Sequence, residues 1–283
     1  MPSTYAHYCF GEKVALNLSP ELKNTVENHK QLYYIGLHGP DILFYFKPLG
    51  KNPVNSSGYE MHERPASEFF KRAADMLEST ADKNASVAYL AGFVCHYALD
   101  KACHGYIEKK IEVSGLAHAE IENEFDRFLI NLNGGDLKHT DLTKHIVPSK
   151  ENAGVIAPFF ENVTAKQVRR SLKSIKFYNG VLIGNRAYKR GLVNFCLKIS
   201  GKYDKMKGSM FSKEPIPACL DSDKRLYKLF LKAIGECVAL QNNFYGYLNG
   251  KNSLEGFNFT FGAGDNWKNI PVFAAEEEDM YEV

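Results

Sequence analysis

Three side chains that can bind a metal ion recur at four-residue intervals in the middle of the chain: His96, Asp100 and His104. Four residues is close to one helical turn, so these side chains project from one face of a helix. His118 and Glu122 repeat the same spacing further along the chain. Imidazole and carboxylate groups arranged in this way are typical of metal-binding helices. They suit zinc best, with manganese or iron as alternatives.

Three further candidate ligands precede these two helices. Asp41 follows Gly39 and Pro40, a pair that favours a turn and so fixes the position of the carboxylate. The full set of candidate metal ligands is His7, Asp41, His62, His96, Asp100, His104, His118 and Glu122. Eight ligands exceed the need of one tetrahedral ion and favour two or three ions. Asp100, which lies between two histidines, is placed to bridge a pair of ions.

The order of these residues resembles that of the zinc-dependent phospholipase C family, whose all-helical fold is shared with fungal single-strand nucleases. The ligands of that family follow in sequence as an N-terminal group and an early His, an Asp, a His, a His-x-x-x-Asp helix, a His, and a His-x-x-x-Glu pair. The eight candidates occur in this order between positions 7 and 122. By motif, the resemblance covers roughly residues 1–125.

The resemblance implies three ions and groups the ligands among them. One ion would be held by Asp41, His62, His96 and Asp100. Asp100 would bridge to a second ion, held also by His7 and the N-terminus, and a third ion would be held by His104, His118 and Glu122. The chain departs from the family pattern in two ways: it begins Met-Pro with no Trp near its start, and His104 follows Asp100 after only four residues.

The reaction implied by the resemblance is metal-assisted hydrolysis of a phosphodiester bond in a phospholipid or a soluble small-molecule phosphodiester. Asp41 is the expected catalytic residue, as a ligand, a general base or both. Lys101 and Arg64 are candidates for binding the phosphate. Two alternatives stay open: a nuclease of the same fold, and a metal-bound binding or structural protein without turnover.

The composition narrows the class of protein. There are 35 basic and 33 acidic residues, and the net charge of +2 gives no indication of a nucleic-acid partner. The N-terminus does not resemble a signal peptide, and no stretch approaches the roughly 20 apolar residues of a membrane-spanning helix. We therefore expect a cytoplasmic protein with six reduced cysteines. The oligomeric state is left open.

Apolar periodicity predicts an all-α fold. The family resemblance implies a compact multi-helix phospholipase C/nuclease-like domain with a multi-metal site between its helices. We expect a single domain over residues 1–283, with the ligands in residues 1–125 and an irregular tail from about 250. The expected helices span about 20–30, 63–79, 84–113, 118–132, 149–162, 164–188 and 221–248. We expect a loop from Gly36 to Gly58 and a solvated acidic tail at residues 276–279. His29, His38, His139 and His145 are expected in loops or on the surface.

Overall fold

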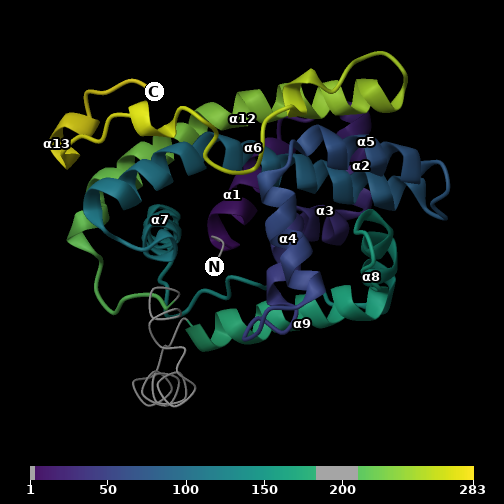
Figure 1. Ribbon diagram of the computed structural model, residues 1–283, viewed down its shortest axis with the longest axis horizontal. Helices are drawn as coiled ribbons and strands as arrows, with labels where there is room; N and C mark the ends of the chain where they lie inside the picture. The colour runs from purple at the N-terminus through teal and green to yellow at the C-terminus, as the bar shows by residue number, and fades with distance from the viewer. Residues whose placement is uncertain (1–3, 183–209) are drawn as a thin grey trace.

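The computed structural model describes residues 4–182 and 210–283, which form helices and connecting loops with no strand among them (Figure 1). The first half contains α1 (Thr4–Ala15), α2 (Pro20–Asn28), α3 (Lys30–Gly36), the 3-10 helix η1 (Gly39–Tyr45), α4 (Pro53–Glu63), α5 (Ala66–Leu77), α6 (Lys83–Ser114) and α7 (His118–Leu132). The second half contains α8 (Lys150–Ile156), η2 (Ala157–Phe159), α9 (Ala165–Leu182), η4 (Pro217–Cys219), α12 (Leu220–Leu248), η5 (Glu255–Phe257), η6 (Trp267–Asn269) and α13 (Ala275–Glu278). The predicted all-α fold is confirmed.

The long helix α6 is the centre of the structure. Asp82 caps its N-terminus by accepting a hydrogen bond from the Ala85 backbone amide, and Gly115 ends it in the left-handed conformation at φ 70°. Every residue from Ala85 to Asp100 is buried, as the apolar sequence predicts. Helices α3 and α12 pack against α6, and α12 runs beside it along the long axis of the molecule (Figure 1). The metal-competent face of α6 is therefore enclosed by other helices.

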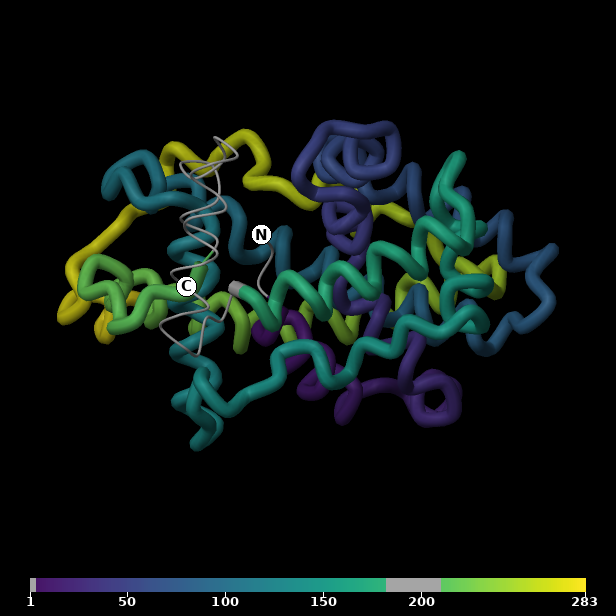
Figure 2. The backbone as a smooth tube through the Cα atoms, turned by 90° about the horizontal axis from the view of Figure 1, so that it is seen from below, coloured from purple at the N-terminus to yellow at the C-terminus, as the bar shows by residue number. Residues whose placement is uncertain are grey.

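Two glycines allow α3 to lie almost backbone to backbone on α6. A Cβ atom added to Gly36 would lie 2.1 Å from the Tyr89 carbonyl oxygen, and one added to Gly92 would lie 2.1 Å from that of Tyr33. This close approach carries η1, which follows α3, directly onto α6. On the opposite side of the molecule, α9 runs along the long axis, as the view from below shows (Figure 2).

Several predicted boundaries in the first half were wrong. Helix α1 contains His7, although no helix was predicted there. The expected loop from Gly36 to Gly58 contains η1 and the start of α4. Pro53 begins α4 at a position where its missing N–H costs nothing, and Asn52 and Asn55 form a reciprocal capping box. This helix, unseen in the sequence, carries His62.

In the second half, the helix expected over residues 149–162 ends as α8 at Ile156 and continues as a short 3-10 turn containing Pro158. Thr164 and Gln167 form the predicted capping interaction before α9, and the expected extension to Tyr188 lies outside the described residues, as does Cys196. The other five cysteines are buried, in agreement with a packing role. None of the described helices is long and apolar enough to cross a membrane.

The prediction of a solvated acidic tail was wrong for Glu278. Its carboxylate is fully buried and accepts two hydrogen bonds of 2.8 Å from the guanidinium of Arg225 on α12. A charged carboxylate is buried only with such a partner, so this pair anchors α13 against α12. The run of acidic residues predicted that Glu278 is exposed. Its partner Arg225 lies 53 residues earlier in the chain, so the pairing could not be predicted from the local sequence.

Candidate metal centre

All eight predicted ligands come together in one region. His7 comes from α1, Asp41 from η1, and His62 from α4. The three remaining histidines and two carboxylates come from α6 and α7, as predicted: His96, Asp100, His104, His118 and Glu122. Their donor atoms form three groups in which all atoms lie within 4.8 Å of one another.

The first group contains Asp41, His62 and His96. Asp41 Oδ1 lies 3.0 Å from His62 Nε2, and Asp41 Oδ2 lies 3.9 Å from His96 Nε2. Gly39 permits this arrangement, because its φ of 46° is unfavourable for other residues and a Cβ there would overlap the His96 ring at 2.1 Å. The backbone of η1 can therefore approach the face of α6 that presents His96.

Asp100 connects the groups. Its Oδ1 lies 3.2 Å from His7 Nε2, and its Oδ2 lies 3.1 Å from His96 Nε2 and 3.8 Å from His62 Nε2. His7, His96 and Asp100 form the second group. The carboxylate thus directs its two oxygens towards different sets of histidines, which is the geometry expected of a bridging ligand.

The third group contains His104, His118 and Glu122. Glu122 Oε1 lies 3.2 Å from His118 Nε2 and 3.9 Å from His104 Nε2. The side chain of His118 is 38% exposed, whereas that of Glu122 is buried. Solvent therefore reaches the centre from the side of α7, and the first two groups lie deeper.

Backbone carbonyl groups orient two of the histidines. His62 Nδ1 lies 2.8 Å from the Gly58 carbonyl oxygen, and His104 Nδ1 lies 2.6 Å from that of Phe261. A carbonyl oxygen only accepts hydrogen bonds, so the proton of each ring is placed on Nδ1. Each Nε2 then has a free lone pair that points into the centre, the arrangement usual for metal-binding histidines.

The carboxylates strongly influence the protonation of the metal-free histidines. Burial lowers the pKa of His62, but Asp41 outweighs this effect and raises that pKa to about 9. Burial likewise opposes protonation of His118, whose pKa is raised to about 10 by Glu122. In turn, despite burial, His96 and His104 hold the pKa of Asp100 well below its usual range. A metal ion would replace these protons, so metal binding should weaken as the pH falls.

The donor set fits zinc. Several buried polar atoms of the centre have no hydrogen-bond partner, among them Asp41 Oδ1, His96 Nε2 and Asp100 Oδ2. Buried polar atoms are almost always paired, so three such acceptors facing one another suit a cation between them. Nitrogen and carboxylate oxygen are ligands that zinc accepts. The assignment of particular residues to particular ions stays a prediction.

His38 lies in the turn between α3 and η1, in agreement with the expected loop position, whereas the expectation that His145 lies at the surface was wrong. Both are buried, their Nε2 atoms are 2.8 Å apart, and their rings are stacked. Burial and neighbouring positive charge lower the pKa of His145 to about 3, so this pair is neutral. His139 is exposed, as predicted. Of the suggested phosphate-binding residues, Lys101 lies over the ring of Phe259 and Arg64 is exposed.

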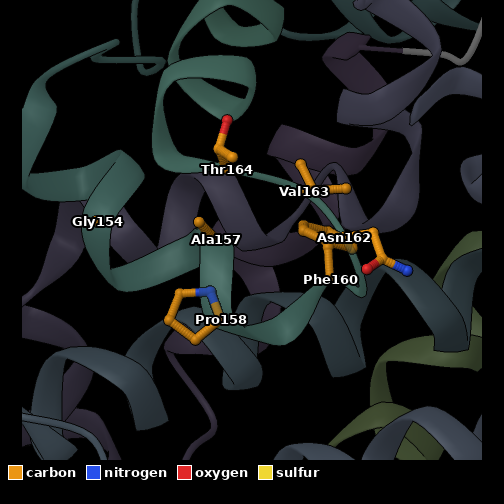
Figure 3. Close-up of a pocket in the computed structure, with 7 residues that line it drawn as sticks. All are labelled: Gly154, Ala157, Pro158, Phe160, Asn162, Val163 and Thr164. Carbon is orange, nitrogen blue, oxygen red and sulfur yellow. The ribbon is translucent and has the colours of Figure 1, made fainter. Parts of the chain in front are cut away.

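One surface hollow lies away from this centre. It has a volume of about 490 Å³ and is formed by the α8–α9 region (Figure 3). Its lining residues are Gly154, Ala157, Pro158, Phe160, Asn162, Val163 and Thr164. None of these side chains is titratable, so the hollow lacks the groups needed for hydrolysis.

The comparison with known families agrees with the geometry. Residues 6–174 match the family described as zinc dependent phospholipase C, and this region is more than half of the chain and contains all eight candidate ligands. The chain therefore belongs to the zinc-dependent phospholipase C family, whose members are phosphodiester hydrolases. No curated protein and no solved structure matches it significantly.

Proposed function

We propose that this protein is a zinc-dependent hydrolase that cleaves a phosphodiester bond of a phospholipid, with the eight candidate ligands holding two or three ions. The observation that carries the proposal is the convergence of five separate elements on three groups of ligand atoms, with buried acceptors left unpaired. A structural metal site needs only one closed set of ligands, whereas several adjacent sets are typical of hydrolytic centres.

The residues of the centre would have different roles in hydrolysis. When bound, zinc lowers the pKa of water to about 7 and offsets the negative charge of a phosphate group. Asp100 fixes the spacing between the histidine sets through its two oxygens. Asp41, close to His62 and with Oδ1 unpaired, is placed to accept a proton from the attacking water. The buried position of both carboxylates excludes bulk water from the reacting atoms.

An aromatic pair beside the centre, with one exposed ring, supports a substrate with an apolar portion. The ring of Tyr59 is stacked on that of Phe44 at 4.2 Å, and Phe44 lies 5.2 Å from the ring of His62. Tyr59 is 57% exposed, so its ring is accessible to a ligand at the surface. A lipid would use this surface, and the family name favours a phospholipid. A nucleotide base would also stack here, so the nuclease alternative must be tested directly.

The test is turnover by protein loaded with zinc and of measured metal content. We expect hydrolysis of a chromogenic phosphocholine ester and of phosphatidylcholine in mixed micelles, and loss of both in Asp41→Asn. Release of nucleotides from single-stranded DNA with no cleavage of the lipid would support the nuclease. If fully metallated protein hydrolyses none of these phosphodiesters, the protein has a binding or structural role.

A further inference from the structure

A segment outside the family match forms part of the metal centre. Residues 258–270, here called the C-terminal wall, follow α12 and η5 and lie beyond residue 174, where the match ends. In Figure 1 the yellow chain after α12 passes back across α6, and η6 within it packs on that helix. The wall is fixed at its start, because the Phe259 carbonyl accepts a 2.9 Å hydrogen bond from the Ala66 amide of α5.

Phe261 is the residue of the wall that reaches the centre. It is 1% exposed, and its ring centroid lies 5.5 Å from that of His62 and 5.9 Å from that of His96. The ring thus packs against ligands of the first and second groups. It limits the rotation of both imidazoles and lowers the local dielectric around them, which strengthens their interaction with charge.

The backbone of Phe261 acts on the third group. Its carbonyl oxygen accepts the Nδ1–H of His104 at 2.6 Å, from a position 157 residues further along the chain. This hydrogen bond decides that the other nitrogen, Nε2, faces Asp100 and Glu122. Without it the ring is free to turn, and either nitrogen can carry the proton. One residue of the wall therefore contacts side chains from all three ligand groups.

Gly105, the residue after His104, allows the wall to lie this close. A Cβ atom on Gly105 would lie 3.0 Å from Ile270 Cδ1 and 3.3 Å from the Ala263 carbonyl oxygen. A larger side chain would therefore push the wall away from α6. Gly235 is a glycine within helix α12, and a Cβ atom added to it would have no atom within 4 Å. It provides a matched control for the effect of replacing a glycine within a helix.

We propose that the C-terminal wall is a positioning element of the metal centre, in which Phe261 holds His104, His62 and His96 in their ligand orientations. The inference rests on the proposed metal-binding function and extends it to a region beyond the family match. It requires that displacement of the wall weakens zinc binding while all eight ligands are retained.

The first experiment compares Gly105→Leu with Gly235→Leu. Zinc equivalents are measured by elemental analysis after dialysis, and zinc affinity by competition with a chromophoric chelator. We expect Gly105→Leu to bind zinc at one or more positions about 10–100-fold more weakly, the usual effect of removing a contact that orients a ligand. Gly235→Leu should bind zinc as the unaltered protein does. Equal affinity in the two variants would overturn the proposal.

A second pair of variants does not depend on Gly105→Leu being folded. Phe261→Ala removes the ring that contacts the ligands, whereas Phe257→Ala removes an equally buried ring that packs on Phe70 and Tyr97. Both should lower the melting temperature, but only Phe261→Ala should weaken zinc binding. A parallel loss of zinc in both would reduce the wall to a stabilising role and refute the inference. If the unaltered protein binds no zinc, the proposed function itself fails.

Discussion

Helices α6 and α7 take part in two buried polar clusters that differ in their chemistry. The metal centre contains five histidines and three carboxylates, without a Lys or Arg among the predicted ligands. The second, here called the ionic cluster, contains Lys110, Glu124, Arg127, Asp221 and Asp223. The clusters are neighbours on the same two helices: Lys110 lies less than two turns after His104, and Glu124 lies two residues after Glu122.

Charges in the ionic cluster are satisfied by the protein itself. Lys110 Nζ donates to both oxygens of Asp221 at 2.8 and 2.6 Å. Glu124 accepts hydrogen bonds from Arg127 at 3.2 Å and from the Ile216 amide at 3.0 Å. The remaining carboxyl, that of Asp223, has its pKa raised to about 8 by burial and by Glu124 and Asp221, so it holds its proton near neutral pH.

The difference shows what distinguishes a binding centre from structural polar packing. A carboxylate beside Lys or Arg has a permanent cation, and nothing further is needed. A carboxylate among imidazoles has no permanent cation nearby, so its charge is balanced either by protons on those rings or by a metal ion that replaces them. Changes in the two clusters should therefore differ in one respect: those in the metal centre should remove metal, whereas those in the ionic cluster should reduce stability and leave the metal content unchanged.

The largest effect is expected from Asp100→Asn. Asp100 contacts histidines of all three groups, so the variant should lose more than one zinc equivalent and its hydrolytic activity. Elemental analysis measures the metal directly. Asp221→Asn, which alters a buried carboxylate of the ionic cluster, is the control and should retain its zinc. Full zinc occupancy in Asp100→Asn would exclude a bridging role.

In the ionic cluster, Lys110→Met should reduce stability without affecting the metal. It leaves Asp221 buried without a cation, which costs about 3–5 kcal/mol of unfolding free energy. Urea denaturation of the zinc-loaded protein provides the measurement. The double variant Lys110→Met/Asp221→Leu removes both charges and should recover most of the loss. If zinc content falls in the folded single variant, the clusters are coupled.

Removal of metal should destabilise the protein through the first cluster alone. Zinc at 100 times its dissociation constant stabilises a folded protein by about 2.7 kcal/mol for each site. A chelator should therefore lower the melting temperature of the unaltered protein, and of Lys110→Met by a similar amount. The melting temperature of Asp100→Asn should respond less. An unchanged melting temperature for the unaltered protein would argue against the centre.

The smallest effect is a pH dependence that originates in Asp223. Its pKa is raised from 3.8 to about 8 on folding, so the unfolded chain loses this proton at lower pH than the folded chain does. The stability that it confers is complete below pH 3.8 and declines as the pH rises to about 8. Asp223→Asn removes the titrating group and should flatten this decline. Denaturation at pH 5 and pH 8 in the presence of chelator provides the comparison, and an unaltered slope would contradict the assignment.

The sequence indicated the ligands well but their surroundings poorly. The regular spacing of His96, Asp100 and His104 on an apolar helix was sufficient to place them on one face, because helical periodicity is a local property. Asp41 and His62 were found only through their order along the chain, since η1 and α4 lie in a stretch rich in Gly and Pro that favours a loop. The role of Phe261 was not predicted. Every residue has a backbone carbonyl, so the sequence does not indicate which one accepts a hydrogen bond from a distant histidine.

The sequence by itself determined the class of fold, the central helix and the identity of the metal-competent side chains. Residue type and helical spacing are local properties, so a short stretch of sequence is enough to recognise them. Tertiary structure decided which of the polar groups lack partners. The sequence predicted that Glu278 and His145 are exposed. In the structure Glu278 is buried against Arg225, and His145 is buried against His38. Asp100 and Asp221 are both buried carboxylates, and only the packing of α1, η1 and α12 around α6 surrounds one with histidines and gives the other a lysine.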